Sequence, residues 1–442
     1  MKLRSIKSVR DLRGKRVIVR VDFNVPLHHG RIDKEGDQRL RAVLPTLKYL
    51  IAKGAVVILI SHLGRPEKWD KKLSLNPVAH HLEKLIKKSV HFLGDKIGSS
   101  GLAKKVRMFK PGEMIMLENL RFYKGEEADD RGFAKKLAAL GQIYVNDAFA
   151  VSHRAHASVS AITKFLPSYA GPLLEAEIEN LGRLLARPKR PFVVLLGGVK
   201  ISTKIGVIKN LLKIADKVLI GGALANNFLK ARDAELGASF YEKDYIGEAR
   251  NLLTNPKIML PVDFLTSESV KKPVNIRREH FPVALHRKET IVDMGPHTIG
   301  EFAEVLKQAK TIVWNGPLGI TEVPEFSHGS LALARIIAAR SSGRVYGVVG
   351  GGDTIPVLER TGHAGFVDWV STGGGAMLEF LEGKILPGVA PLIIKASKHR
   401  SIEAKKHRNI KASKHRNIET SKQKNKKIKK QGGLKSLFSF LF

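Results

Sequence analysis

Short apolar runs in the first half of this sequence are followed by segments rich in arginine, histidine and asparagine. These segments read DFNVP, SHLGRP, ENLRF and NDAFAVSHRAHAS. Arginine donates hydrogen bonds in pairs with fixed geometry, which suits the oxygens of carboxylates and phosphates. Four arginines lie near the ends of different runs: Arg39, Arg65, Arg121 and Arg154. Any one of them alone is more typical of a solvated surface, but together we expect them to converge on one small anion with more than one acidic group.

The corresponding segments of the second half are rich in glycine and read GGVKISTK, GGALANN, DMGP, WNGPLGITE, GGGDT and STGGG. Glycine after a strand lets backbone N–H groups approach the phosphates of a nucleotide, and a following helix N-terminus adds favourable partial charge. Each segment alone is also consistent with an ordinary turn, and GGVKISTK, which holds Lys200 and Lys204, lacks the Walker spacing. Asp353, in GGGDT, is equally consistent with a cap of the next helix. Together the two halves predict phosphoryl transfer between a nucleotide and a small phosphorylated acid.

The elements that must position these segments are short β-rich apolar runs separated by helix-like stretches. The runs cover residues 16–22, 55–60, 114–117, 143–146, 192–196, 217–220, 258–260, 290–293, 311–314, 345–349 and 366–370. Nearly continuous apolar strands alternating with helices indicate parallel sheets covered on both faces. So many strands favour an α/β fold of two doubly wound, Rossmann-like parallel-sheet domains with about six strands each. Within 166–191, a Gly-Pro start and a proline-containing end predict one amphipathic helix that joins the domains.

Composition bounds the class of protein. A chain of 442 residues with 43% hydrophobic residues can bury a large core, and the absence of cysteine excludes disulfides, thiolate metal sites and a cysteine nucleophile. The N-terminus is charged throughout, and no apolar run approaches the ~18 residues of a membrane span. We therefore expect an unprocessed, soluble, cytoplasmic protein without a transmembrane segment.

The net charge of +35 is extreme, and +14 of it lies between Lys395 and the end of the chain. This tail, 395–442, contains an eight-residue repeat over 396–427 and ends in the apolar LKSLFSFLF. It lacks the apolar surface needed to offset its ordering entropy, so we expect it to be disordered and to bind polyanions without sequence preference. The remaining +21 suits nucleic acid, a membrane surface or phosphorylated metabolites, and composition does not choose among them.

The order of the motifs identifies a family. RVDFNVP, SHLGRP, ENLRFYKGEE, NDAF with HRAHAS, DMGP, WNGPLG, GGGDT and STGGGAMLEFLEGKILPG follow one another here as in phosphoglycerate kinases, and the resemblance runs from about residue 5 to residue 392. It implies a glycolytic enzyme that transfers a phosphoryl group reversibly from 1,3-bisphosphoglycerate to ADP, giving 3-phosphoglycerate and ATP. It also implies Mg²⁺ on the nucleotide and a monomeric chain.

The resemblance implies roles for individual residues. The triose-binding set is Asp22, Phe23, Asn24, Arg39, His62, Leu63, Gly64, Arg65, Arg121 and Arg154. The nucleotide-binding set is Lys200, Lys204, Gly295, Asn315, Glu322, Gly351, Gly352, Asp353 and Thr354. Within these sets, Asp353 is expected to hold Mg²⁺ and Glu322 to bind ribose hydroxyls. The expected catalytic residues are Arg39, Lys204 and Gly374, with Lys204 reaching the transferred phosphoryl group.

The domain boundaries follow from the same resemblance. They are 1–171 for the triose-binding domain, 172–186 for the hinge helix, 187–380 for the nucleotide-binding domain, 381–394 for a C-terminal segment of the kinase core, and 395–442 for the tail.

Three residues depart from the usual family pattern: Val199 replaces Ala, Thr203 replaces Asp and Thr321 replaces Phe. Thr203 removes a carboxylate beside Lys204 and Val199 adds bulk, so nucleotide affinity or closure is expected to differ from the family norm. The alternative hypothesis is a nucleic-acid-binding protein with a degenerate kinase body. A degenerate body is expected to lose some anion-site arginines or Asp353, and this sequence keeps them all.

Overall fold

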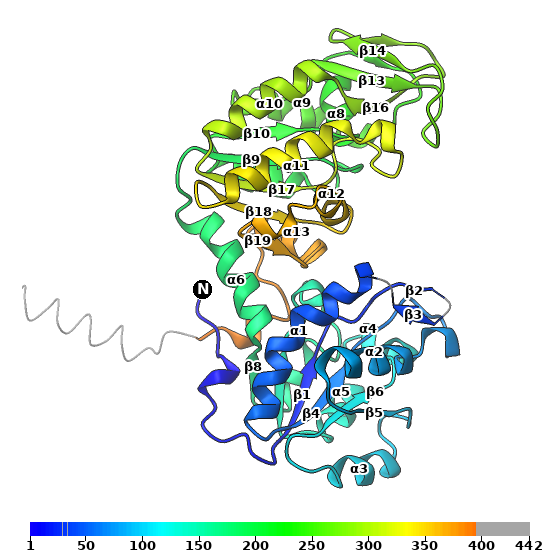
Figure 1. Cartoon of the computed structure of the whole chain (residues 1–442), viewed down its shortest axis with the longest axis vertical. Coiled ribbons are helices and arrows are strands. Elements are labelled where there is room, and N and C mark those ends of the chain that lie inside the picture. Colours follow the sequence, from blue (N-terminus) through cyan, green and yellow to red (C-terminus); the bar gives the residue numbers. More distant parts are fainter. Residues whose placement is uncertain (29, 33, 395–442) are drawn as a thin grey trace, which may run out of the picture. The chain divides into compact units, whose positions relative to one another are not determined.

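A computed structural model describes residues 1–394 except residues 29 and 33, so the predicted tail, 395–442, lies outside the described residues. Met1–Ile393 forms one compact unit that contains two six-stranded sheets (Figure 1). Every pair of neighbouring strands in both sheets is parallel. The predicted fold class, two doubly wound α/β domains, is therefore confirmed. We call them the N-terminal lobe, built on the first sheet, and the C-terminal lobe, built on the second.

The sheet of the N-terminal lobe has the strand order β5-β6-β4-β1-β7-β8. Its strands are β1 (Arg16–Arg20), β4 (Val56–Ile60), β5 (Val90–Leu93), β6 (Met114–Leu117), β7 (Ile143–Asn146) and β8 (Ser168–Ala170). Its helices are α1 (Lys34–Ala52), α2 (Asn76–Ile86), α3 (Ser100–Arg107), α4 (Lys124–Glu127) and α5 (Arg131–Ala138). Alternate strand residues point to opposite faces. Accordingly Val17 and Val57 pack with α1 and α2, whereas Ile18 and Ile58 pack with α3 and α5.

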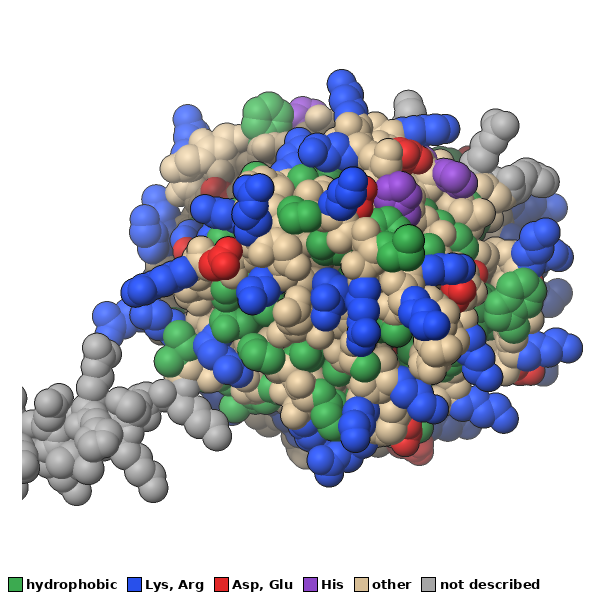
Figure 2. Space-filling view, turned by 90° about the horizontal axis from the view of Figure 1, so that it is seen from below, with side chains coloured by type: hydrophobic (Ala, Val, Ile, Leu, Met, Phe, Trp, Pro, Cys, Tyr) green, Lys and Arg blue, Asp and Glu red, His purple; other side chains and the backbone are tan. Residues whose placement is uncertain are grey.

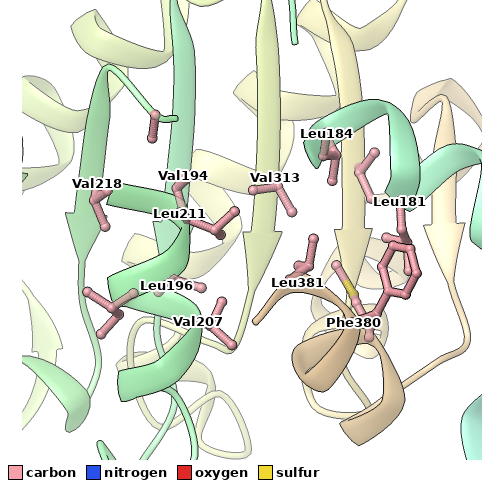
Figure 3. Close-up of a cluster of buried hydrophobic side chains, with 14 of the residues drawn as sticks. Leu181, Leu184, Val194, Leu196, Val207, Leu211, Val218, Val313, Phe380 and Leu381 are labelled. Atoms are coloured by element: carbon pink, nitrogen blue, oxygen red, sulfur yellow. The ribbon is translucent and has the colours of Figure 1, made fainter. Parts of the chain in front are cut away.

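The sheet of the C-terminal lobe has the order β12-β10-β9-β17-β18-β19. Its strands are β9 (Phe192–Leu196), β10 (Lys217–Ile220), β12 (Ile258–Met259), β17 (Thr311–Asn315), β18 (Tyr346–Gly350) and β19 (Trp369–Ser371). Its helices are α7 (Ile205–Leu212), α8 (Leu224–Lys230), α9 (Ile246–Leu252), α10 (Pro296–Gln308), α11 (His328–Ser341), α12 (Thr354–Arg360) and α13 (Gly375–Leu381). Helices α10, α11 and α12 share one core with Val193 and Ile312, while α7 and α13 share another with Val194 and Val313 (Figure 3).

Smaller strand groups accompany the two main sheets: an antiparallel three-stranded sheet and a parallel two-stranded pair in the C-terminal lobe, and an antiparallel pair in the N-terminal lobe. Strands β13 (Asp263–Ser267), β14 (Arg277–His280) and β16 (Thr290–Met294) form a sheet in the order β14-β13-β16. Two-stranded pairs are formed by β11 (Glu235–Leu236) with β15 (Ala284–Leu285) and by β2 (Leu27–His28) with β3 (Arg31–Ile32). The run at 290–293 is thus a strand, as predicted, but it lies in an antiparallel sheet. A four-residue apolar run looks the same in either kind of sheet, so its sequence does not reveal the partner strand.

One helix connects the lobes. Helix α6 (Pro172–Ala186) begins after Gly171, whose lack of a side chain leaves the first turn without a cap of its own. The Asp147 carboxylate, just after β7, accepts hydrogen bonds from the backbone N–H groups of Leu173 (2.9 Å) and Leu174 (3.1 Å). A Cβ on Gly171 would lie 2.2 Å from Asp147 Oδ1, so this close approach requires glycine. The N-terminal lobe therefore caps the connecting helix.

The same helix is joined to the C-terminal lobe by Glu177, which is fully buried. Its carboxylate accepts hydrogen bonds from Trp369 Nε1 (2.9 Å), Ser371 Oγ (2.8 Å) and the Thr372 backbone N–H (2.9 Å). Leu181 and Leu184 of α6 pack into the core of the C-terminal lobe (Figure 3). One buried carboxylate thus fixes the start of α6 to the first lobe, and a second fixes its middle to the other.

Candidate active site

The carboxyl ends of β1 and β4 hold the first part of the predicted anion site. Asp22 follows β1 and forms an ion pair with Arg39 of α1. Asn24 Oδ1 accepts a hydrogen bond from the Gly64 backbone N–H at 2.8 Å, and this bond joins the loops after the two strands. His62 Nδ1 lies 3.9 Å from Asp22 Oδ1. These predicted residues are brought together.

Asn119, after β6, holds the next loops in register. Its side-chain oxygen accepts from the backbone N–H groups of Leu63 (3.1 Å) and Arg121 (3.0 Å), and its amide donates to the Leu63 carbonyl at 2.7 Å. Phe23 is fully buried, and its backbone N–H donates to Ser61 Oγ at 2.9 Å. Buried polar side chains thus fix the turns from which the predicted triose ligands project.

The cluster is strongly positive. His62 is almost completely buried, and its pKa lies well below the usual value because of burial and the neighbouring positive charges of Arg20, Arg121 and Arg154. Arg20 donates from its guanidinium to His62 Nδ1 at 3.2 Å, which assigns the remaining ring proton to Nε2. His62 is therefore neutral at pH 7 and offers one N–H donor.

The other predicted arginines differ in burial. The Arg121 side chain is only 3% exposed and forms an ion pair with Glu127. Arg154 is half-buried, and its Nε donates to His153 Nε2 at 3.2 Å. Arg65 is exposed at the loop after β4. Burial, together with the positive charge of Arg154, lowers the pKa of Arg121, although the carboxylate of Glu127 opposes this shift.

Sequence reasoning missed four residues of this cluster: Arg20, Glu126, His153 and His156. Arg20 is 1% exposed and donates to Ser158 Oγ at 2.9 Å, while the buried Glu126 accepts from the same hydroxyl at 2.5 Å. His156 Nδ1 lies 4.0 Å from Glu126, and burial together with the arginines lowers its pKa to about 4. An arginine inside the apolar run RVIVRVD was the available signal for Arg20. Glu126 lies within the motif ENLRFYKGEE, and His153 and His156 lie within HRAHAS, so these motifs were the available signal for them.

The C-terminal lobe contains a cavity of about 630 Å³ whose wall is mainly apolar. Gly198, after β9, Glu322, after β17, and Asp353, after β18, all line it. Val199 and Phe240 also line it and remain 57% and 45% exposed. An apolar cavity with a few polar groups at its edge is typical of a nucleotide-base site.

Lys204 lies at the N-terminus of α7, and its ammonium group is buried between two glycine turns. Its Nζ donates to the carbonyl oxygens of Gly197 (2.5 Å) and Asn315 (3.2 Å). Gly198 has φ +94° and Gly316 has φ +95°, and a Cβ on Gly316 would lie 2.4 Å from Lys204 Nζ. Burial lowers the pKa of Lys204 to about 8, while the charge of Asp353 raises it, so the ammonium is still mostly charged at pH 7.

Asp353 precedes α12 at its N-cap position, yet its side chain makes no capping hydrogen bond. The alternative that it merely caps the helix is therefore wrong. Its carboxylate is exposed at the cavity. Among the described residues, no group of three or more histidines or carboxylates could hold a metal ion. One exposed carboxylate at the edge of this cavity fits Mg²⁺, which is usually held by one or two carboxylates together with substrate phosphates.

The remaining predicted nucleotide residues lie around this centre. Thr354 Oγ1 accepts a hydrogen bond from the Gly316 backbone N–H at 2.7 Å, and Asn315 Nδ2 donates to the Gly350 carbonyl at 2.8 Å. Lys200 is exposed next to Val199. Gly295 begins α10, and it is not among the residues that line the cavity, although Asp293 and Met294 are.

A second cavity, of about 260 Å³, is shared by both lobes. Asn24 and Arg39 line it from the N-terminal lobe, and Gly351, Gly352 and Gly374 line it from the C-terminal lobe. Gly374 has φ +51°, a backbone conformation that glycine adopts without strain. Two residues of the predicted anion site and the glycine turns therefore line one common space.

The comparisons with known proteins settle the family. The family model described as phosphoglycerate kinase matches residues 6–384. The chain belongs to the phosphoglycerate kinase family. It is 47% identical over 390 residues to the phosphoglycerate kinase of Dictyoglomus turgidum, covering 86% of this chain and 96% of that protein. The enzyme of Moorella thermoacetica is 46% identical, with 87% and 98% covered.

Solved structures agree. The phosphoglycerate kinase structure from Coxiella burnetii has a TM-score of 0.77 and 38% identity, covering 88% of this chain and 99% of that one. The structure from Pyrococcus horikoshii has the same TM-score and 32% identity. The chain is thus an enzyme, a glycolytic phosphoglycerate kinase. The matches give no support to the alternative of a nucleic-acid-binding protein with a degenerate kinase body.

The residues that depart from the family pattern differ in their surroundings. Val199 lines the cavity of about 630 Å³. Thr203 is exposed, and its hydroxyl donates to the Lys200 carbonyl at 3.0 Å. Thr321 is buried, and its carbonyl accepts from Arg360 at 2.7 Å. Of the three, Val199 is the one at the cavity wall.

Within the described residues, no helix is both long enough and apolar enough to span a membrane.

Proposed function

We propose that this phosphoglycerate kinase binds its triose in the N-terminal lobe and its nucleotide in the C-terminal lobe, and that the phosphoryl group passes between them at the cavity lined by Arg39 and Gly374. The observation that supports this most directly is the shared cavity itself. Asn24 and Arg39 line it from one side, and the glycine turns of Gly351, Gly352 and Gly374 line it from the other. The domain boundaries at 171–172 and 186–187 belong to the same proposal.

The triose is held by its two charged ends. Arg65, Arg121 and Arg154, with His62, offer the donors that a phosphate group needs, and they lie at the carboxyl ends of β4, β6 and β7. Arg39, held by Asp22, faces the shared cavity and is suited to the reacting carboxyl group. Phe23, Asn24, Leu63 and Gly64 shape the loops around the substrate. Neutral His62 contributes a hydrogen bond without adding another charge.

The nucleotide enters the 630 Å³ cavity with its base against the apolar wall and its ribose at Glu322. Its phosphates extend toward Lys200, Lys204 and the turn of Gly351–Thr354, with Asn315 and Gly295 supporting the surrounding backbone. Asp353 would hold Mg²⁺, which neutralises phosphate charge when it is bound with the nucleotide.

In the direction of ATP formation, a terminal phosphate oxygen of ADP forms a bond to the phosphorus of the acyl phosphate, and the bond from that phosphorus to the carboxyl oxygen breaks. The carboxylate of 3-phosphoglycerate leaves with the electron pair. Lys204 and Arg39 stabilise the negative charge on the phosphoryl group in flight, and the Gly374 backbone approaches it without steric hindrance. No side chain needs to gain or lose a proton in this step.

The reacting oxygen and phosphorus must approach to roughly 3–3.5 Å, so the lobes close about α6 when both substrates are bound. Small-angle scattering tests this: the radius of gyration should be smaller with both substrates than with either one alone. We further propose that the enzyme acts as a cytoplasmic monomer. The tail, outside the described residues, is proposed to bind polyanions without taking part in catalysis.

A coupled assay of ATP formation on the full chain tests the function. Activity is expected with 1,3-bisphosphoglycerate, ADP and Mg²⁺, and Asp353→Asn should raise the Mg²⁺ concentration needed for half-maximal rate by at least tenfold. Asp368→Asn is a matched control, since Asp368 accepts from the Gly347 backbone N–H away from both cavities. An unchanged Mg²⁺ requirement in Asp353→Asn would refute the metal assignment, and an inactive full chain would refute the function.

A further inference from the structure

Basic residues gather at the amino ends of the strands in the N-terminal lobe, at the edge of the sheet opposite to the active site. The segments that lead into the six strands are 9–15, 48–54, 84–89, 104–113, 135–142 and 164–167. They contain fifteen lysines and arginines: Arg10, Arg13, Lys15, Lys48, Lys53, Lys84, Lys87, Lys88, Lys104, Lys105, Arg107, Lys110, Lys135, Lys136 and Lys164. Their acidic residues number two, Asp11 and Glu113. In Figure 2, Lys and Arg side chains far outnumber Asp and Glu on the face seen from below.

The centre of this basic face is one continuous surface. The Gly14 backbone N–H donates to the Gly54 carbonyl at 2.8 Å, and the Gly112 N–H donates to the Ala55 carbonyl at 3.0 Å. These bonds join the loops that precede β1, β4 and β6, which are neighbours in the sheet. Arg13, Lys53 and Lys110, one from each loop, therefore lie close together, and all three side chains are exposed.

The two acidic residues bond to backbone N–H groups and, within the described residues, form no ion pair with the three cations of this centre. Asp11 accepts a hydrogen bond from the Arg13 backbone N–H at 3.0 Å, and Glu113 accepts from the Lys110 backbone N–H at 2.5 Å. Across the described part of the chain, the side chains of Arg13, Lys53 and Lys110 form no ion pair. Three neighbouring cations are thus left to solvent.

Helix dipoles explain only part of the pattern. Lys84, Lys104, Lys105, Lys135 and Lys136 lie in last turns of helices, where positive charge is favourable. Arg13 and Lys110 lie in the loops that enter strands, and Lys53 follows the end of α1. The dipole of α1 favours Lys53 as well, but no helix dipole or ion pair within the described residues accounts for Arg13.

We propose that this basic face binds the phosphate backbone of a duplex nucleic acid, independently of the kinase reaction. Strands about 4.8 Å apart place the six entrances along a width of roughly 25 Å, over which a duplex presents on the order of 14 phosphate charges. Twelve of the fifteen basic residues are lysines, which act as point charges toward phosphates without bidentate geometry. A small anion would use only a few of them.

The scarcity of exposed apolar side chains on this basic face favours a duplex over single strands and membranes. Single strands bind by stacking bases on aromatic side chains, and peripheral membrane binding needs apolar insertion besides charge. Met108 is the one large apolar side chain that these segments leave exposed. A duplex needs neither stacking nor insertion, because its phosphates alone supply sequence-independent affinity.

The test uses the full chain with Arg13→Glu, Lys53→Glu and Lys110→Glu combined. The matched control combines Lys213→Glu, Lys288→Glu and Arg344→Glu, which change the net charge equally at exposed, separate sites of the C-terminal lobe. Binding of a 24-base-pair duplex of arbitrary sequence is measured by fluorescence anisotropy between 50 and 200 mM salt. The first variant should bind at least tenfold more weakly than the control near physiological salt, and its slope of log K against log salt should be shallower by about 2.7, which is three contacts at 0.9 each.

Kinase activity reports folding in both variants and should stay within about twofold of the parent. If the first variant loses activity, the combination of Arg13→Gln, Lys53→Gln and Lys110→Gln replaces it, with the same expectation for binding. Equal losses of duplex affinity in the first variant and in the control would show that only net charge matters and would overturn the proposal. Binding to vesicles of anionic lipid without binding to the duplex would also overturn it, in favour of a membrane surface.

Discussion

The two lobes share a fold, but the N-terminal lobe forms its half of the active site mainly from charged side chains and the C-terminal lobe mainly from backbone turns. In the N-terminal lobe, charged side chains converge at the strand ends, and buried partners such as Arg20 and Glu126 hold them in place. In the C-terminal lobe, glycine turns bring backbone close to an apolar cavity, and Lys204 is the one buried cation among its predicted site residues. The first half should therefore respond to changes of charge, and the second to changes of shape and of this single ammonium.

The largest effect is expected for Lys204→Ala. Its ammonium group is most useful when phosphoryl charge lies between the substrates, so kcat should fall by at least 100-fold while the KM for triose changes little. Lys209→Ala is the matched control, because Lys209 lies on α7 and forms an exposed ion pair with Glu248. A kcat within about threefold of the parent would contradict the assignment of Lys204 to the transferring phosphoryl group.

The connection between the lobes should respond to pH. Burial raises the pKa of Asp147 to about 6 in the folded chain from an ordinary value of 3.8. A raised folded-state pKa stabilises the fold below pH 4, and this contribution is lost as pH rises to 6 and above. Asp147→Asn keeps an oxygen that can accept hydrogen bonds from the N–H groups of the first turn of α6, but it has no group that titrates. The free energy of unfolding of this variant relative to the parent should therefore increase from pH 4 to above pH 6, by up to about 3 kcal/mol.

Urea unfolding at pH 4.5, 6 and 8 measures this difference. Asp130→Asn serves as the control, since Asp130 caps α5 at a more exposed position. A stability difference between Asp147→Asn and the parent that stays constant with pH would show that Asp147 titrates normally.

Much of this architecture could be predicted from the sequence, and the failures have physical causes. Apolar runs located strands such as β9 and β17 correctly, because strands buried on both faces are continuous in hydrophobicity. Strands β5 and β8 were missed, since VHFL and SYA carry a polar residue or too few residues to show a pattern. The run at 290–293 was predicted to be a strand of a parallel sheet, but it lies in the antiparallel sheet β14-β13-β16.

Part of the candidate site could likewise be predicted from the sequence, and part could not. Motifs located Asp22 and Asp353 because these residues lie within three positions of a strand end, where ligands of α/β sheets bind, and Arg39 lies in the helix that follows. The supporting groups come from elsewhere: Glu126 lies in a short helix, and Glu177 in α6 reaches the loop after β19. Their roles depend on contacts between residues distant in the chain, which spacing along the sequence does not reveal.

Arg65→Ala probes the charge-based half of the site. Arg65 is exposed and supplies one of several positive charges, so its loss should weaken triose binding by about tenfold in KM, with kcat within about threefold of the parent. Arg131→Ala, which removes an exposed arginine at the start of α5, is the control and should change neither constant. A larger effect on kcat than on KM would place Arg65 at the reacting group instead.

The smallest effect is expected for Val199→Ala, which tests the shape-based half. Val199 lines the nucleotide cavity and is 57% exposed, so a bound base would cover apolar surface that is open in the free protein. Complete burial of one methyl group contributes about 0.8 kcal/mol, and valine has two more such groups to bury than alanine. Because a bound base would bury them only in part, removing them should weaken ADP binding by roughly threefold. Calorimetric titration of ADP measures this, with Ile385→Ala as the control, because Ile385 is 62% exposed and is not among the residues that line either active-site cavity. Tighter binding by Val199→Ala would mean that the valine obstructs the nucleotide, and the departure from the family alanine would then lower affinity by steric hindrance.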